Sequence, residues 1–209
     1  MAATLDFYFD FSSPYGYFAS TAIERLANDI HREIRWRPIL LGPLFKAMGS
    51  GPLVEIPLKG AYSRHDIERS ARLFGIPYQE PAAFPIGAVA ASRAMLFLQK
   101  QDPLLAADFA KRVYRAYFAE GQDITQLEVL ASLANQAGAD GNRLPQGIAT
   151  DDIKNQLKEE VSAAMARGVF GSPYIIVDDE PFWGFDRFEH IRKWMAERGG
   201  PRGQTPNGA

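Results

Sequence analysis

The stretch Leu5-Asp-Phe-Tyr-Phe-Asp-Phe-Ser-Ser-Pro-Tyr15 decides the fold. Its first seven residues are mostly aromatic and alternate, which predicts a buried strand over 5–11. Ser13 suits a helix N-cap and Pro14 the first helical position, because proline lacks the N–H that would be unsatisfied there. Apolar residues then recur at helical spacing, which predicts one helix over 14–30. The Ser13 hydroxyl is therefore expected where a helix begins, a place that stabilises an anion; a helix cap alone explains the same pattern.

The composition narrows the classes of function. The 209-residue chain has a formal charge of −2, which gives no electrostatic reason for binding nucleic acid or a membrane surface. It has no cysteine, which excludes disulfides, thiolate metal ligands and a protein thiol nucleophile. The histidines are scattered, so no metal site is expected. No apolar run is long enough for a bilayer and the first residues lack a signal-peptide pattern, so we expect a cytoplasmic location.

The rest of the chain alternates between short strands and long helices. Residues 33–38 predict a second strand, parallel to the first, with Pro38 ending it or placing it at a sheet edge. Further helices are predicted at 61–74, 88–101, 104–119, 126–137 and 150–168, with a linker at 138–147. A strand at 174–177, a short returning strand at 182–183 and a helix at 187–197 follow. This order predicts an α/β fold with a mixed sheet and a helical insertion.

The layout carries a resemblance. Strand–helix–strand followed by strand–strand–helix resembles thioredoxin, in which a helix starts at the reactive group and a cis-proline lies against it. Here those positions are Ser13-Pro14 and Ser172-Pro173. The helical insertion is similar to that of DsbA. Within this superfamily the chain resembles the 2-hydroxychromene-2-carboxylate isomerases and the related kappa-class glutathione transferases. The matching stretches are Phe9–Tyr15, Arg37–Gly42, Lys46–Pro52, Gly168–Pro173 and Gly184–Arg187.

The resemblance implies a division of the chain. Residues 1–40 and 148–198 would form the two halves of a thioredoxin-like domain, and residues 41–147 a helical insertion domain. Residues 199–209 are Gly/Pro-rich and polar, so we expect them to be disordered. Relatives suggest a homodimer.

The resemblance also implies a chemical role for Ser13. It would replace the redox cysteine and hydrogen-bond the sulfur of bound glutathione, the implied cofactor. A free thiol has a pKa of about 8.5. A hydrogen bond to an ion contributes about 1.5–3 kcal/mol and a helix N-terminus about 0.3–2 kcal/mol. These effects bring the thiolate within reach of neutral pH, because one pKa unit is about 1.4 kcal/mol.

The same resemblance implies that other residues bind the cofactor. The backbone of Ser172, before a cis Pro173, would pair with the cysteinyl group of glutathione; a trans proline at a strand start is the alternative. Asp186 would hold the γ-glutamyl amino group beside the Phe185 backbone, and a capping box for the last helix also explains Asp186. Ser50 stands where relatives carry an asparagine that touches glutathione, and it lacks the amide donor.

The sequence indicates the substrate-binding residues less specifically than the cofactor-binding residues. Lys46 and Arg37 are candidates to pair a substrate carboxylate, although a solvated lysine and a charged strand end explain them too. Tyr15 and Tyr17 are expected to line the pocket, and Tyr15 equally fits the core face of its helix. Pro14 lies between Ser13 and Tyr15 and is included in the expected cofactor site.

Three functions fit the sequence. The first is a glutathione-dependent isomerase of the 2-hydroxychromene-2-carboxylate type, acting on an aromatic-degradation intermediate and regenerating glutathione. The second is a kappa-like glutathione transferase, in which the adduct is the product. The third is a non-catalytic DsbA-like binding protein, in which Ser13 only caps its helix. A thiol–disulfide oxidoreductase is excluded because the chain has no cysteine.

Overall fold

A four-stranded mixed sheet forms the centre of the protein. The computed structural model describes residues 3–199. The strands β1 (Thr4–Phe9), β2 (Glu33–Pro38), β3 (Tyr174–Val177) and β4 (Glu180–Trp183) lie in the order β2-β1-β3-β4. β1 pairs parallel with β2 and antiparallel with β3, and β3 pairs antiparallel with β4. β2 is thus an edge strand, the position predicted by its final proline, Pro38.

The alternation of β1 divides the core between the two faces of the sheet. Phe7 and Phe9 pack into the larger apolar cluster, and the Phe9 ring lies 5.5 Å from that of Trp36. Tyr8 points to the other face, where it joins Ile39 in the smaller cluster. Because both faces are covered, β1 is buried almost throughout, as its aromatic composition predicts.

The predicted single helix over 14–30 is wrong, because the chain forms two helices. These are α1 (Pro14–Ser20) and α2 (Ile23–Asp29). At the break, the hydroxyls of Ser20 and Thr21 donate to the carbonyls of Tyr17 and Phe18, each at 2.7 Å. Such local hydroxyl bonds compete with the helical ladder. The apolar spacing continues across the break, which explains why the sequence pattern shows one helix.

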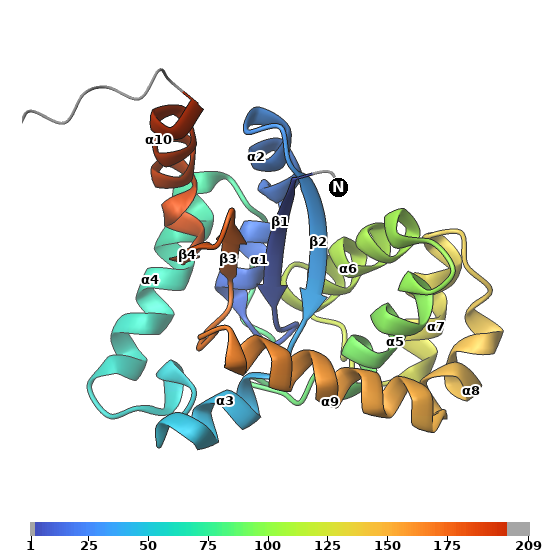
Figure 1. Ribbon diagram of the computed structural model, residues 1–209. Helices are drawn as coiled ribbons and strands as arrows, with labels where there is room; N and C mark the ends of the chain where they lie inside the picture. The colour runs from blue at the N-terminus through green and yellow to red at the C-terminus, as the bar shows by residue number, and fades with distance from the viewer. Residues whose placement is uncertain (1–2, 200–209) are drawn as a thin grey trace, which may run out of the picture.

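The remaining helices cover the sheet and form the insertion (Figure 1). They are α3 (Leu41–Met48), α4 (Lys59–Phe74), α5 (Val89–Gln99), α6 (Pro103–Phe118), α7 (Leu127–Gln136), α8 (Leu144–Ala149), α9 (Asp151–Ala166) and α10 (Phe188–Gly199). In Figure 1, α5–α8 gather on one side of the sheet, and α9 leads back from them. The fold is therefore the predicted thioredoxin-like sheet with a helical insertion.

The structure differs from two sequence predictions, for the linker and for the C-terminal tail. The predicted linker over 138–147 contains the short 3-10 helix Gly141–Arg143 and the start of α8, because Leu144 and Ile148 are buried. The disorder predicted for 199–209 begins too early, since Gly199 ends α10; residues 200–209 lie outside the described part. The division into a two-part domain and an insertion domain stays a prediction. No helix between residues 3 and 199 is long and apolar enough to cross a membrane.

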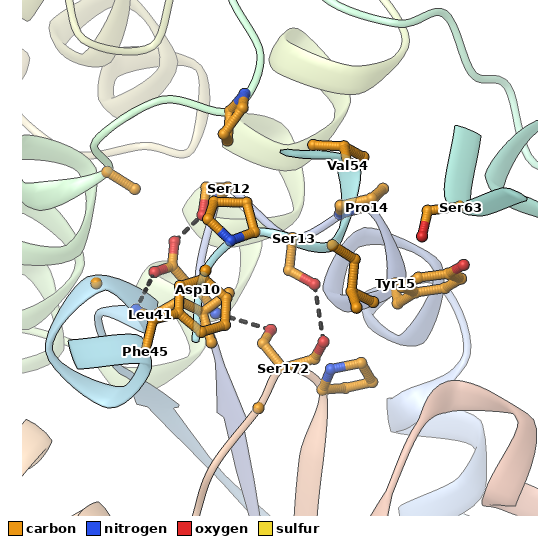
Figure 2. Close-up of a pocket in the computed structure, with 18 of the residues that line it drawn as sticks. Asp10, Ser12, Ser13, Pro14, Tyr15, Leu41, Phe45, Val54, Ser63 and Ser172 are labelled. Atoms are coloured by element: carbon orange, nitrogen blue, oxygen red, sulfur yellow. Dashed lines mark hydrogen bonds between the residues drawn. The ribbon is translucent and has the colours of Figure 1, made fainter. Parts of the chain in front are cut away.

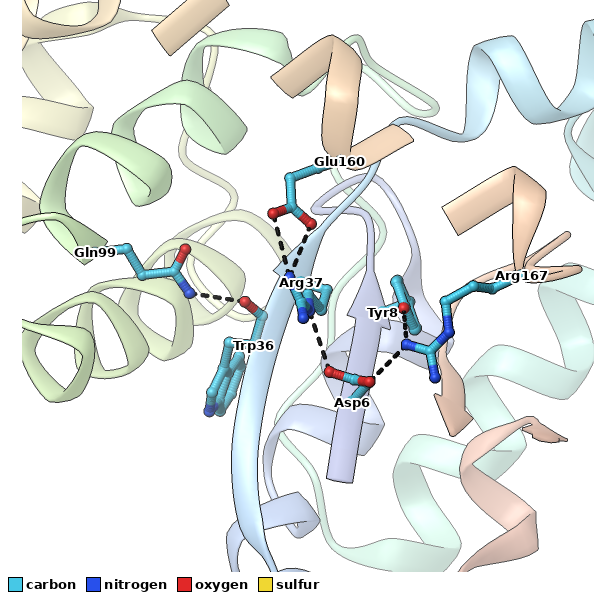
Figure 3. Close-up of polar contacts among 7 residues, drawn as sticks. All are labelled: Asp6, Tyr8, Trp36, Arg37, Gln99, Glu160 and Arg167. Carbon is cyan, nitrogen blue, oxygen red and sulfur yellow. Dashed lines mark hydrogen bonds and ion pairs between the residues drawn. The ribbon is translucent and has the colours of Figure 1, made fainter. Parts of the chain in front are cut away.

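A half-buried polar cluster fastens α9 to the sheet (Figure 3). Asp6 on β1 pairs with Arg37 on β2 at 3.1 Å and with Arg167, which ends α9, at 2.6 Å. Arg37 also reaches Glu160 on α9 at 3.3 Å. These contacts fix the end of α9 just before the chain turns toward Ser172.

Tyr114 joins the insertion to the first turn of α1. This fully buried residue of α6 donates its hydroxyl to the carbonyl of Asp10 at 2.9 Å. A Cβ placed on Gly16 would lie 2.4 Å from the Tyr114 hydroxyl oxygen and 2.8 Å from that of Ser172. Only glycine therefore allows α1 and α6 to approach this closely.

We predict that Gly16→Ala destabilises the protein by about 1–3 kcal/mol, the usual cost of overpacking a filled core. Gly42→Ala is the matched control, because a Cβ there meets nothing within 4 Å. The control should leave stability equal or raise it by up to about 1 kcal/mol. Urea unfolding followed by circular dichroism measures both variants, and a Gly16→Ala protein as stable as wild type would contradict the close approach.

Candidate active site

A single cavity brings the two predicted halves of the site together. Its volume is about 870 Å³, which is within the range of ligand pockets. The cavity is lined by the start of α1, the segment before β3 and the turn after β4. Residues of α3, α4 and the loop before α5 complete the lining. The predicted residues that line it are Ser13, Pro14, Tyr15, Ser50, Ser172, Pro173, Phe185 and Asp186.

Ser13 lies at the base of this cavity, with 3% of its surface exposed. Its Oγ accepts a hydrogen bond from the Gly16 N–H at 3.0 Å, so Ser13 is the N-cap of α1. The same hydroxyl donates to the Ser172 carbonyl at 2.8 Å. Figure 2 shows the two serines facing each other across this contact. The cap uses only an acceptor site of the hydroxyl, so rotation about the C–O bond can turn its proton from the Ser172 carbonyl to another acceptor in the cavity.

The predicted cis peptide bond between Ser172 and Pro173 is confirmed. The Ser172 side chain faces away from the Ser13 contact, and its Oγ accepts from the Asp10 N–H at 3.0 Å. The Ser172 hydroxyl thus anchors the loop while its backbone borders the cavity. A second cis peptide bond, Phe84–Pro85, also lies in the lining and was not predicted.

The predicted capping box at Asp186 is wrong. The chain forms a 3-10 turn, Phe185–Arg187, after Gly184, whose φ of 111° suits glycine. α10 consequently begins only at Phe188, and Asp186 lies inside the turn. Its carboxylate pairs with Arg187 at 3.3 Å, and its side chain is 56% exposed. The side chain is therefore available to a ligand.

Comparison with known proteins explains this arrangement. Residues 4–196 match the family model of the DsbA-like thioredoxin domain. The chain is 31% identical to 2-hydroxychromene-2-carboxylate isomerase of Sphingobium xenophagum, over 94% of this chain and 100% of that protein. This chain belongs to the 2-hydroxychromene-2-carboxylate isomerase family. A solved structure of an isomerase of this name superimposes with a TM-score of 0.82 at 30% identity, covering 94% of this chain and 96% of the other.

The wider family includes transferases. Glutathione S-transferase kappa 1 of Rattus norvegicus is 27% identical over 91% of this chain and 92% of its own length. The predicted family, the DsbA-like fold and the enzyme class, an isomerase, are thus confirmed. The third sequence hypothesis, a non-catalytic binding protein, loses its support because these relatives are named as enzymes.

The three predicted substrate residues of this isomerase-family chain lie outside the cavity lining. Arg37 is held in the cluster with Asp6 and Glu160. Tyr17 is buried, donates its hydroxyl to the Pro77 carbonyl at 2.9 Å and stacks on Phe118. Lys46 is exposed on α3. The structure thus gives Arg37 and Tyr17 packing roles, and we do not carry these three residues into the proposed substrate site.

Tyr15 both lines the cavity and packs against the core, the two positions that the sequence predicted for it. Its ring stacks on Phe185 at 6.0 Å. Its hydroxyl donates to Asp66 on α4 at 2.7 Å. Burial, and then this contact with Asp66, raise the pKa of Tyr15 above its ordinary value. Tyr15 is therefore neutral at physiological pH and joins α1 to the α4 wall.

The sequence analysis missed several lining residues. One is Asp10, a buried carboxylate at the end of β1. Another is Arg187, the cation beside Asp186. The apolar wall was also missed, because it comes from α3 and from loops without regular periodicity; it includes Phe45, Met48, Val54, Ile86 and Val89. Between residues 3 and 199, no three His, Cys, Asp or Glu side chains are grouped so that they could hold a metal ion.

We predict that Asp186→Ala leaves stability within about 0.5 kcal/mol of wild type, because no cap is lost. Asp102→Ala is the matched control: Asp102 caps α6 through the Leu104 N–H at 2.8 Å, so its loss should lower stability by about 1 kcal/mol. Thermal unfolding measures both variants, and a large loss of stability in Asp186→Ala would show that Asp186 is a cap after all.

Proposed function

We propose that this protein isomerises 2-hydroxychromene-2-carboxylate, or a closely related intermediate of aromatic degradation, with glutathione as its cofactor. Bound glutathione would supply a thiolate that adds to the substrate and leaves again after bond rotation. One observation supports the proposal above the others: the Ser13 hydroxyl lies 2.8 Å from the carbonyl before the cis proline, at the base of the large cavity.

Ser13 would hold the sulfur of the cofactor. Its Oγ stays fixed by the Gly16 N–H, while rotation of the O–H bond redirects its proton from the Ser172 carbonyl to the sulfur. A hydrogen bond to an ionised group contributes about 1.5–3 kcal/mol, which lowers a thiol pKa by about one to two units. Because a free thiol has a pKa of about 8.5, this contact alone brings the thiolate near neutral pH.

The remaining polar groups of the cavity match the other groups of glutathione. The Ser172 backbone, freed from the Ser13 hydroxyl, can pair with the cysteinyl peptide unit. Asp186, which has no capping role, can pair with the γ-glutamyl ammonium, and Arg187 beside it with a carboxylate. Pro14, Tyr15, Ser50 and Phe185 line the same space. The residues present therefore fit the cofactor that the family implies.

The apolar wall would hold the substrate ring. Phe45 and Met48 from α3 and Val54 beyond it line the cavity with Ile86 from the loop before α5. Such a surface binds a flat aromatic group by burial and leaves orientation to a few polar contacts. The chain thus offers an apolar substrate space beside the polar cofactor space.

A kappa-like glutathione transferase is the second candidate. It is favoured by the 27% identity to the rat kappa enzyme over most of both chains. The two functions share the Ser13 contact and differ in whether the sulfur adduct is released as product.

We also propose a cytoplasmic homodimer. The cytosol maintains the reduced glutathione that the reaction needs. The α4 region exposes large apolar side chains, of which Leu58 is 97%, Leu73 is 73% and Phe74 is 61% exposed, and Phe74 contacts Phe185 of the cavity. A mass by light scattering equal to that of one chain would contradict the dimer.

We predict catalytic use of glutathione. With 2-hydroxychromene-2-carboxylate and a small amount of reduced glutathione, the substrate should equilibrate with its ring-opened isomer over many turnovers. Chromatography follows the isomers, and thiol titration should find the glutathione unchanged. Loss of one thiol for each product would instead identify the transferase, and equal rates without glutathione would contradict both functions.

We predict that Ser13→Ala lowers kcat/KM about tenfold to a hundredfold at neutral pH, because the thiol pKa rises by the lost hydrogen bond. The ultraviolet absorbance of bound thiolate should titrate at correspondingly higher pH. Thr150→Ala is the matched control, because it removes the N-cap of α9, which lies outside the cavity lining. Each variant loses one helix cap, so each should be destabilised by about 0.5–2 kcal/mol. Full activity in Ser13→Ala would end the mechanism.

A further inference from the structure

Asp10 is a buried carboxylate that the proposed reaction does not use. It is 3% exposed, and no ion pair within residues 3–199 includes it. Burial raises the pKa of the Asp10 carboxyl, and hydrogen bonds from Ser12 and Leu41 act in the opposite direction. Burying a carboxylate without a cation costs folding free energy, so contacts beside the cavity must offset this cost.

The Asp10 carboxylate joins two separate segments. Its Oδ1 accepts from the Ser12 N–H at 2.8 Å, and its Oδ2 accepts from the Leu41 N–H at 2.6 Å. Figure 2 shows the Asp10 carboxylate with a dashed line to each of the two segments. One side chain therefore bridges the turn that carries Ser13 and the first residue of α3.

α3 depends on this contact at its N-terminus. The first amides of a helix have no partner within the helix. The N-cap residue of α3, Leu40, offers no side-chain acceptor, so the cap comes from Asp10, 31 residues before Leu41. α3 then carries Phe45 and Met48 into the apolar wall.

The backbone of Asp10 is held as firmly as its side chain. Its N–H donates to the Ser172 hydroxyl at 3.0 Å. Its carbonyl accepts from the Tyr114 hydroxyl and from the Ser13 N–H, each at 2.9 Å. Asp10 is thus fixed to the Ser13 turn, the cis-proline loop and the insertion, and its carboxylate extends this fixed point to α3.

We propose that Asp10 is a positioning residue that clamps α3 onto the Ser13 turn, so that the apolar wall holds the substrate over the sulfur. The kinetic part of this inference rests on the proposed function, and the clamp itself does not. The substitution Asp10→Asn tests the clamp because it keeps the size of the side chain. Its amide accepts at one atom only, so either the Leu41 or the Ser12 N–H is left without its partner.

Hydrogen exchange tests the clamp without any ligand. In wild type, the Leu41 amide should exchange as slowly as amides inside α3, although it belongs to the first turn. In Asp10→Asn, exchange should accelerate at least tenfold in residues 41–50, more than in α1 or α6, because one charge-assisted hydrogen bond has a free energy of that order. Fast exchange of Leu41 in wild type would overturn the clamp even if the variant does not fold.

Kinetics test the positioning role. In Asp10→Asn the KM for the aromatic substrate should rise about tenfold, while kcat and the Kd for glutathione change less than about threefold. Asp6→Asn is the matched control: it removes another buried carboxylate, which pairs with Arg37 and Arg167 and does not line the cavity. It should lose stability without a selective change in KM or in exchange of 41–50.

The outcomes separate the two ideas. Accelerated exchange with unchanged KM would overturn the positioning role, and unchanged exchange of both the Leu41 and the Ser12 amides would overturn the clamp. Absence of glutathione-dependent turnover in wild type would refute the proposed function by itself, while the exchange of Leu41 would still decide the clamp.

Discussion

The contact between the Ser13 hydroxyl and the Ser172 carbonyl is the constraint around which the site is built. It joins the start of α1 to the loop before β3 at 2.8 Å. Ser13 is fixed because its Oγ caps α1, and Ser172 because its own Oγ accepts from the Asp10 N–H. The positions of the two serines therefore depend on buried hydrogen bonds between hydroxyl and main-chain groups.

The helical insertion contributes to the same precision. Tyr114 reaches from α6 to the Asp10 carbonyl, and Gly16 makes room for it. On the other face of the sheet, Arg167 and Arg37 meet at Asp6 and hold the end of α9. The insertion is thus part of the support of the active site, and α3 is tied to the same centre because its first amide donates to Asp10.

The sequence was most informative where chemistry and spacing coincide. The aromatic alternation of β1, the Ser13-Pro14 helix start and the proline after Ser172 predicted the fold and the facing elements. The capping role predicted for Asp186 was wrong because the sequence pattern of a capping box does not show the 3-10 turn that begins after Gly184. The α1–α2 break was missed because hydroxyl-to-carbonyl bonds leave the apolar period unchanged. Asp10 was missed because only the fold brings Leu41 beside it.

The distance along the chain between the two serines has a consequence for biosynthesis. Ser13 and Ser172 are 159 positions apart, so the first half of the site leaves the ribosome long before its partner exists. Until β3 is added at the centre of the sheet, β1 has only β2 as a neighbour and its aromatic faces stay incompletely covered. A truncated or still-growing chain consequently has no functional pocket, and assembly of the site is one of the last events in the maturation of this protein.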